Sequence, residues 1–170
     1  MKFLALVTLA AFAAAAKPTV YLIRHGEKPE DDDEHGLSTQ GMQRAQCLRQ
    51  VFGASSPYNI GHIMAQEYKP SGARKRAYDT VKPLADDLGM KVDVSCDRDD
   101  PDCVKDVVKH YDGKGNILIC WEHKKLNNIV KALGGDIDNY PSDRFDIIWI
   151  DEPPYKHISE TSEHCPGLDN

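Results

Sequence analysis

The chain has 170 residues, of which 41% are hydrophobic and 28% are charged, so it can form one sizeable core but not comfortably two. Twenty-one Lys and Arg stand against 27 Asp and Glu, which gives a formal net charge of -6. Such an acidic chain is not expected to bind nucleic acid or membranes, and its Gly and Pro content excludes collagen-like and disordered classes.

The first 16 residues have the pattern of a secretory signal peptide. A single lysine is followed by an apolar stretch, and small residues at Ala14 and Ala16 predict cleavage before Lys17. The stretch is too short to cross a hydrocarbon core of ~30 Å as a helix. A retained amphipathic or buried N-terminal helix is the alternative. We therefore predict that residues 17–170 form one secreted domain.

Strand-like and helix-like patterns alternate along this domain. Short apolar runs predict strands at 19–23, 60–65, 91–94, 116–120 and 145–150. Apolar residues three or four positions apart predict helices over 42–52, 77–88, 104–111 and 126–133. Ser38 or Thr39 can cap the first helix, and the chain from about Glu152 is expected to be an irregular tail. The alternation predicts a three-layer α/β fold, in which a mostly parallel sheet carries helices on both faces.

Five cysteines in a secreted chain permit disulfide bonds. Cys96 and Cys103 enclose six residues, which favours a local bridge between them. Cys47 lies in a helical pattern and Cys165 in the tail, so a bond between these two would pin the C-terminus. Cys120 ends an apolar run and is expected to be a buried free thiol. The spacing alone leaves other pairings open.

Reactive side chains follow two of the predicted strands. Arg24 and His25 come directly after the first strand, and His123 follows the strand at 116–120. Between them in the sequence, Arg76 lies at the start of a predicted helix, where backbone N–H groups also favour anions. Ligands of parallel sheets bind at the carboxyl ends of the strands, so we expect these side chains to meet in one crevice. Arginine suits phosphate oxygens, and an imidazole can accept a phosphoryl group.

Four sequence blocks resemble the histidine phosphatase superfamily, which has the phosphoglycerate mutase-like fold. The blocks are 21–27 with its Arg-His-Gly, 36–41 with Ala45, Arg76-Ala77 with Thr80 and 84–85, and 117–123. Their order and spacing match that family over roughly 20–133, which is most of the chain after the signal peptide. The signal peptide and the short chain suggest a small secreted branch of the family.

The resemblance implies roles for four residues. His25 would be the nucleophile that becomes phosphohistidine. The phosphate would be held, and its charge stabilised during transfer, by Arg24, Arg76 and His123 together with His25. Neither a metal nor another cofactor is implied. Phosphoryl transfer depends mainly on positioning and electrostatic stabilisation, which agrees with a crevice of this composition.

The resemblance does not fix the proton donor, because its position varies between branches of the family. Glu27 is the first candidate. The other carboxyl candidates are Glu122, Asp97, Asp99, Asp100 and Asp102. His123 is followed by Lys124, so the His-Asp pair that marks the acid phosphatase and phytase branch is absent.

The sequence thus predicts a secreted, metal-independent phosphatase, a phosphoric monoester hydrolase that acts on small phosphate monoesters through phosphohistidine. A non-catalytic phosphate-binding protein of the same fold, without an effective proton donor, is the alternative. Release of phosphate with turnover distinguishes the two. The expected partner is a small phosphorylated substrate, with no nucleic acid and no membrane. The residues do not identify the substrate or the oligomeric state.

Overall fold

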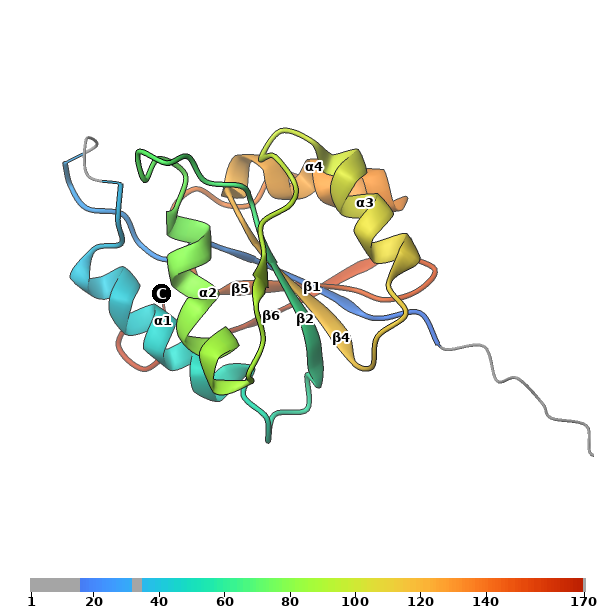
Figure 1. Ribbon diagram of the computed structural model, residues 1–170, viewed down its shortest axis with the longest axis horizontal. Helices are drawn as coiled ribbons and strands as arrows, with labels where there is room; N and C mark the ends of the chain where they lie inside the picture. The colour runs from blue at the N-terminus through green and yellow to red at the C-terminus, as the bar shows by residue number, and fades with distance from the viewer. Residues whose placement is uncertain (1–15, 32–34, 170) are drawn as a thin grey trace, which may run out of the picture.

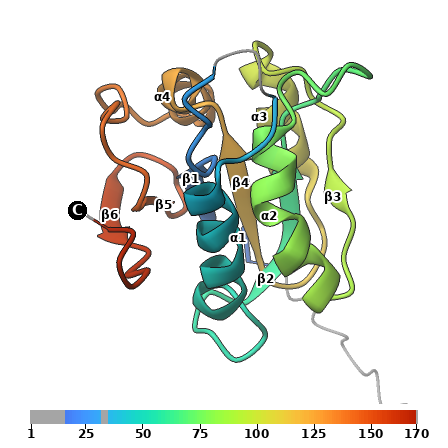
Figure 2. The same ribbon diagram turned by 90° about the vertical axis from the view of Figure 1, so that its left-hand side faces the viewer.

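The computed structural model describes residues 16–31 and 35–169, and it places a six-stranded sheet between two pairs of helices (Figures 1 and 2). The strands are β1 (Val20–Arg24), β2 (Ile60–Ala65), β3 (Val92–Asp93), β4 (Asn116–Trp121), β5 (Ile147–Asp151) and β6 (Ile158–Ser162). The helices are α1 (Thr39–Val51), α2 (Arg76–Asp87), α3 (Pro101–His110) and α4 (His123–Leu133).

The strands follow the order β3-β2-β4-β1-β5-β6 across the sheet. The first four in this order are parallel, whereas β5 is antiparallel to β1 and β6 is antiparallel to β5. The prediction of an α/β fold with a mostly parallel sheet is therefore confirmed.

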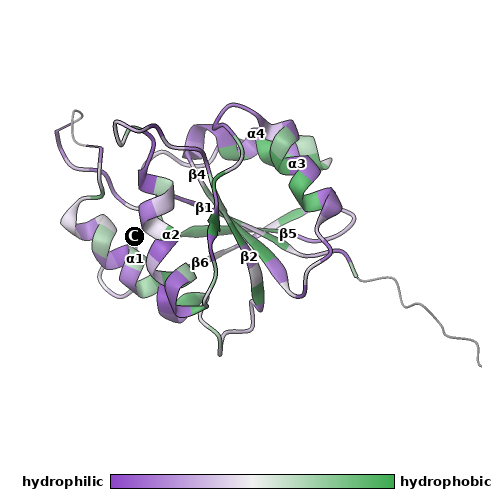
Figure 3. Cartoon of the chain, in the orientation of Figure 1, coloured by the Kyte–Doolittle hydropathy of each residue, from purple (hydrophilic) through white to green (hydrophobic). Residues whose placement is uncertain are grey.

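Both faces of the sheet are apolar because each face is covered by helices. Successive residues of β1 enter opposite cores: Leu22 packs in the core under α3 and α4, and Ile23 packs in the core under α1 and α2. Both side chains are fully buried. Figure 3 shows the strands mainly in green and the outer surfaces of helices and loops largely in purple. This pattern accounts for the continuous apolar runs of the parallel strands.

The C-terminal tail contains a strand, β6, so the expectation of an irregular tail from about residue 152 is wrong for this part. Its sequence, Ile-Ser-Glu-Thr-Ser, has neither an apolar run nor a clear alternation, and its side chains are half-buried or exposed. As an edge strand it pairs on one side only, and its backbone hydrogen bonds to β5 hold it in place. Local sequence gives little sign of such a strand.

Capping residues set the ends of three of the helices. The side chain of Ser38 accepts a hydrogen bond from the Gly41 N–H at the start of α1, as predicted. Asp100 caps α3 in the same way. Gly134 ends α4 with a φ of 116°, in the left-handed region that favours glycine.

The two disulfides that the sequence favours are present. Cys96–Cys103 closes the loop before α3, and Cys47–Cys165 ties α1 to the C-terminal tail with a Cα–Cα distance of 5.9 Å. Cys120 is free and fully buried, and burial raises the pKa of its thiol well above the ordinary value. The Cys96–Cys103 bridge and the free thiol of Cys120 agree with the expectation, whereas the sequence left the partner of Cys47 open.

The predicted signal peptide, 1–16, lies outside the described residues except for Ala16. Within the part of the chain that is described, no helix combines the length and the apolar character needed to cross a membrane.

Candidate active site

The register between β1 and β4 brings the two candidate histidines together. Arg24 pairs with Trp121 in this parallel ladder, so His25 and Glu122 are the next residues on the two neighbouring strands. The His25 N–H donates to the Trp121 carbonyl at 3.2 Å and thereby continues the ladder by one step. His123 then begins α4. The carboxyl edge of the sheet is thus the crevice that the strand-end rule predicts.

His25 is buried, with 4% of its surface exposed. Its Nδ1 lies 2.8 Å from the carbonyl oxygen of Gly26. A carbonyl oxygen only accepts hydrogen bonds, so Nδ1 carries a proton. The other ring nitrogen, Nε2, lies 3.4 Å from Oε2 of Glu122. Nε2 is therefore the nitrogen whose lone pair becomes available when the ring is neutral.

The loop after β1 is held by two helices. The Gly26 N–H donates to Oγ1 of Thr80 at 2.8 Å, and this hydroxyl donates in turn to the Arg76 carbonyl in the first turn of α2 at 2.7 Å. On the other side, Gly41 of α1 packs so closely that a Cβ there would lie 2.4 Å from the Glu27 carbonyl oxygen. These contacts fix the backbone on both sides of the His25 ring.

Arg24 is buried beneath the crevice. One terminal nitrogen donates to the carbonyls of Ser142 and Arg144, each at 2.8 Å, and the guanidinium stacks 3.6 Å from the Phe145 ring centroid. Burial lowers the pKa of Arg24, but a guanidinium stays charged in proteins. Among the described residues its Nε has no hydrogen-bond partner, so Arg24 retains capacity to donate to an anion.

A pocket of about 140 Å³ lies at this edge of the sheet. Its lining residues are His25, Gln66, Arg74, Arg76, Arg98 and Glu122. Arg76 donates from Nε to the Gly36 carbonyl at 3.0 Å. His123 lines a second cavity of about 580 Å³, together with residues of the 139–142 segment. The structure therefore brings His25 and Arg76 into one pocket, whereas His123 lines the second cavity, and the buried Arg24 donates to Ser142 of that cavity wall.

Of the carboxyl groups in the described part of the chain, that of Glu122 is closest to the His25 ring, at 3.4 Å from Nε2. Its backbone N–H donates to Oε1 of Gln66 at 2.9 Å, which fixes its position after β4. Burial alone would raise the pKa of Glu122, but the hydrogen bond with His25 and the charges of His25 and His123 outweigh burial and lower it to about 2. Glu122 is therefore ionised near neutral pH while the site is empty of anions.

His123 lies on the other side of Glu122. Its Nδ1 is 2.7 Å from Oε1 of Glu122, without the geometry of a hydrogen bond, and it has no other partner among the described residues. Burial, followed by the positive charge of Arg24, lowers the pKa of His123. A neutral imidazole with an unused nitrogen is thus available beside the carboxylate.

Glu27, the first candidate for the proton donor, does not line the pocket. Both of its oxygens are bound by Arg44 at 2.8 to 3.2 Å, and Arg44 is fully buried. Arg44 also donates to Glu163 and Asp169 from the C-terminal tail. Burial raises the pKa of Glu163 to about 8, so this cluster holds a proton near neutral pH. Glu27 therefore ties the loop after β1 to α1 and to the tail.

The candidate aspartates between 97 and 102 all have other partners. Hydrogen bonding from the Asp99 N–H and the charge of Arg74, at 2.9 Å, lower the pKa of Asp97. Hydrogen bonds from Arg98 and Lys125 lower the pKa of Asp99. Asp100 caps α3. Asp102 pairs with Lys105 of the same helix. None of these groups lines the pocket, whereas Glu122 does.

Sequence reasoning missed Gln66 and Arg98 at the pocket. Gln66 is the first residue after β2, a parallel neighbour of β4, so the strand-end rule that selected His25 would also have selected it. Arg98 lies in the loop closed by Cys96–Cys103, and its carbonyl accepts a hydrogen bond from the Trp121 indole at 3.0 Å. Nothing local in the sequence indicates that this loop reaches the end of β4.

Within residues 16–31 and 35–169, two groups of side chains bring metal-ligand atoms within 4.8 Å of one another. The first is His25, Glu122 and His123, a donor set that zinc accepts. The arginines that line this pocket favour an anion over a cation, however. The second is Glu163, Cys165 and Asp169, but the Cys165 sulfur is bonded to Cys47 and is no thiolate ligand.

No family model matches the chain, and a search of curated proteins finds no match to its sequence. Solved structures are similar in three dimensions. The protein histidine phosphatase SixA in complex with tungstate is 15% identical, with 85% of this chain and 97% of that chain covered and a TM-score of 0.59. The chain has the histidine phosphatase fold.

Two further structures extend this likeness. Phosphoserine phosphatase of Entamoeba histolytica with 3-phosphoglyceric acid is 14% identical, covers 85% of this chain and 95% of its own, and has a TM-score of 0.52. The mycobacterial glucosyl-3-phosphoglycerate phosphatase with inorganic phosphate has the same identity, coverage and TM-score. At these identities the likeness establishes the fold, as the sequence blocks led us to expect.

Proposed function

We propose that the protein is a secreted phosphatase that hydrolyses small phosphate monoesters through a phosphohistidine on His25, with Glu122 as the proton donor. The observation that carries the proposal is the pair of His25 Nε2 and Glu122 Oε2, 3.4 Å apart in a pocket that three arginines line. Tungstate and inorganic phosphate, both tetrahedral oxyanions, accompany two of the proteins with the same fold. Their presence there supports phosphate as the group bound here.

The phosphate of the substrate would be held by Arg24, Arg76 and His123. Arginine donates several N–H groups in a planar fork that suits phosphate oxygens. The burial of Arg24 lowers the local dielectric constant and so strengthens its attraction for an anion. Since the two arginines supply the positive charge that transfer of a phosphoryl group requires, the proposed reaction uses no metal ion or other cofactor.

One proton shared by His25 and Glu122 prepares the site for reaction. A bound phosphate dianion places negative charge next to Glu122 and therefore raises the pKa of this carboxyl group. The proton then moves from Nε2 of His25 to Oε2 of Glu122. This single transfer produces a neutral nucleophile and a protonated acid at the same time.

The reaction then proceeds in two steps. The Nε2 lone pair forms a bond to phosphorus, the ester P–O bond breaks, and the leaving oxygen takes the proton from Glu122. In the second step water attacks phosphorus and gives a proton to the Glu122 carboxylate, while the P–N bond breaks and its electron pair returns to Nε2. The sum is ester plus water to alcohol plus phosphate.

Glu122 replaces Glu27 as the proposed donor because of their different partners. Glu27 is held on both oxygens by Arg44 and does not line the pocket, whereas Glu122 lies within reach of both His25 and a bound substrate. A non-catalytic phosphate-binding protein was the alternative because no proton donor was evident. The position of Glu122 favours the enzyme.

Secretion is part of the same proposal. It rests on the predicted signal peptide and is supported by two disulfide bonds, which persist in oxidising compartments. Detection of the protein in the culture medium, with Lys17 as its first residue, would test it.

The first experiment measures phosphate release from p-nitrophenyl phosphate between pH 4 and pH 8, with EDTA present. We expect turnover that EDTA does not reduce and that His25→Ala lowers by about a thousandfold or more. His157→Ala, which alters an exposed histidine of the tail, is the matched control and should leave turnover unchanged.

A trapping experiment identifies the intermediate. Protein quenched in base during turnover should carry phosphate on His25, and His25→Ala should carry none. Absence of turnover in the parent protein, together with binding of vanadate, would instead establish the phosphate-binding alternative. Full activity of His25→Ala would exclude the proposed nucleophile.

A further inference from the structure

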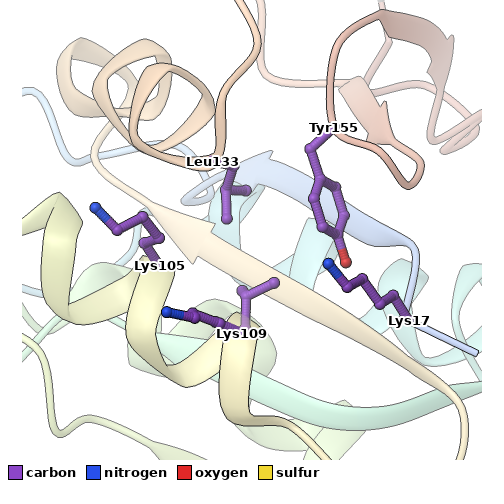
Figure 4. Close-up of a pocket in the computed structure, with 6 residues that line it drawn as sticks. Lys17, Lys105, Lys109, Leu133 and Tyr155 are labelled. Atoms are coloured by element: carbon purple, nitrogen blue, oxygen red, sulfur yellow. The ribbon is translucent and has the colours of Figure 1, made fainter. Parts of the chain in front are cut away.

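A further cavity of about 210 Å³, distinct from the pocket at His25 and from the cavity at His123, lies on the side of the sheet covered by α3 and α4. Its lining residues are Lys17, Lys105, Val108, Lys109, Leu133 and Tyr155 (Figure 4). Leu133 ends α4, the helix that begins at His123, and 11 residues of helix span about 16 Å. Lys17 likewise precedes β1, the strand that leads to His25. The cavity is therefore separate from the candidate active site and lies at the opposite end of the same elements.

The inner wall of this cavity is apolar and firmly held. Val108 and Tyr155 are 3% and 8% exposed, and Leu133 is half-buried. The Tyr155 hydroxyl donates to the Pro18 carbonyl at 2.8 Å, so the ring is fixed and its polar atom is already satisfied. In Figure 4, Leu133 and Tyr155 enter from one side and the two α3 lysines from the other. The wall offers a surface for a hydrocarbon chain or a ring.

The rim of the cavity is positively charged. Three of its six lining residues are lysines and none is a carboxylate. Lys105 donates to Asp102, and this hydrogen bond, together with the charges of Asp102 and Asp106, raises the pKa of the lysine. Among the described residues, neither Lys17 nor Lys109 has an ion-pair partner. The two ammonium groups of Lys17 and Lys109, which no described carboxylate neutralises, contrast with the formal net charge of -6 for the chain.

We propose that this cavity binds a small amphiphilic anion, a molecule with one carboxylate or sulfonate group and a compact apolar body. The anionic group would lie against Lys17 and Lys109, and the apolar body would cover Val108, Leu133 and the Tyr155 ring. Free phosphate does not fit this chemistry because it leaves the apolar wall without a partner. The volume is below the roughly 300–1,000 Å³ typical of sites for drug-sized ligands, so the ligand has a short chain or one or two rings. This site is independent of the proposed phosphatase function.

The test uses 5-(dimethylamino)naphthalene-1-sulfonate, a two-ring anion whose fluorescence rises in apolar surroundings, titrated into the purified protein at low salt. A unit charge at about 4 Å in water changes a dissociation constant about fivefold. We therefore expect the dissociation constant to rise about fivefold in Lys109→Met and about 25-fold in Lys109→Glu. Lys109 is exposed, so neither change should disturb the fold. Added NaCl should weaken binding to the parent protein.

Lys82→Glu is the matched control, because it makes the same change in net charge on α2, on the opposite face of the sheet. It should leave dye binding within about twofold of the parent. Decanoate should displace the dye, and 10-fold more inorganic phosphate should not. His25→Ala should bind the dye as the parent does, whatever its phosphatase activity.

Two outcomes would overturn the proposal. Equal dye binding by the parent and by Lys109→Glu would show that the dye does not bind in this cavity. Displacement of the dye by inorganic phosphate or vanadate would place it in the candidate active site instead.

Discussion

Two glutamates close to His25 in this molecule show how partners decide the chemistry of a side chain. Glu27 follows His25 by two positions in the loop after β1, and a fully buried arginine binds both of its oxygens. Glu122 is distant in sequence but follows the neighbouring strand, and it lies 3.4 Å from His25 Nε2. The first is held by an ion pair with Arg44, whereas the second contacts the ring of the proposed nucleophile.

The difference teaches that proximity in sequence is a poor guide to which carboxyl group contacts the His25 ring. The two carboxyl groups belong to the same residue type and both are mostly buried, but Arg44 neutralises one and His25 contacts the other. A third carboxyl group, Asp151, completes the series. It is fully buried, and neither of its oxygens has a hydrogen-bond partner among the described residues. The four predictions below test what each partner does.

The largest effect is expected for Glu122→Gln. A general acid contributes about 10²- to 10⁴-fold to a rate, and it matters most when the leaving group is a poor one. We expect kcat to fall about a thousandfold for an alkyl phosphate such as glycerol phosphate, and at most about tenfold for p-nitrophenyl phosphate. Steady-state kinetics on both substrates measure the fall in kcat for each one.

Glu27→Gln is the control for this comparison. It should change the two rates by similar factors, because Glu27 does not reach the leaving group. If Glu27→Gln alone impaired the alkyl substrate selectively, the assignment of the two glutamates would be reversed.

Arg44→Met tests the arginine that binds Glu27. The change leaves Glu27 and Glu163 buried without their cation, and removal of one member of a buried pair costs about 3–5 kcal/mol. We expect urea denaturation to show a loss of this size in the free energy of unfolding. Arg49→Met breaks the exposed pair with Asp87 on the same helix and should cost less than about 1 kcal/mol. Equal losses in the two variants would contradict the structural role of Arg44.

Asp151→Asn tests a buried carboxyl group that forms no hydrogen bond with any described residue. Burial raises the pKa of Asp151 to about 7 from an ordinary value of 3.8. The folded protein thus retains a proton that the unfolded chain loses above pH 3.8, so stability falls as the pH rises from about 3.8 to 7. Between pH 5 and pH 8 this group should cost the parent protein about 3 kcal/mol, and the variant should not show that loss.

Urea denaturation at the two pH values measures the difference. The raised pKa of Glu163 contributes a change of the same sign, but Glu163 is present in both proteins and cancels in the comparison. Parallel pH profiles for the parent and Asp151→Asn would show that Asp151 is ionised in the folded state.

The smallest effect is expected from the double variant Cys96→Ser with Cys103→Ser. The bond closes a loop with a sequence separation of 7, for which loop-closure entropy predicts a loss of about 2 kcal/mol. The same loop carries Arg98 to the pocket, so KM should rise while kcat for p-nitrophenyl phosphate changes little. Thermal unfolding and steady-state kinetics check both parts. A selective fall in kcat would indicate that the loop acts on the reacting groups instead.

Local patterns sufficed to predict most of the fold and the histidine pair. The runs before Arg24 and before Glu122 are buried strands, and the strand-end rule placed His25 and His123 at one edge because parallel strands share that edge. The short bridge Cys96–Cys103 followed from its spacing, whereas the pairing of Cys47 with Cys165 stayed open. The strand β6 was missed because its polar sequence is held by pairing with β5, an interaction that is not local.

The same reason explains the contacts at the site that the sequence did not indicate. Arg44 occurs in a helical pattern where an arginine normally faces solvent, and only the fold shows that the tail and the loop after β1 enclose it. The direction of the Glu27 side chain depends on that enclosure. The position of Glu122 depends on the register of β1 and β4, which a pattern of apolar residues constrains to one face but does not align residue by residue.

That register has a consequence for how the protein can change over evolutionary time. His25 and Glu122 are separated by one step of a backbone ladder, so the distance between them does not depend on the helices and loops that connect β1 to β4. Insertions in those connections would alter which molecules reach the pocket and leave the pair intact. A single deletion inside either strand would move one partner by about 3.3 Å and turn it to the other face of the sheet. The His25–Glu122 pair and the loops around the pocket are therefore free to change separately.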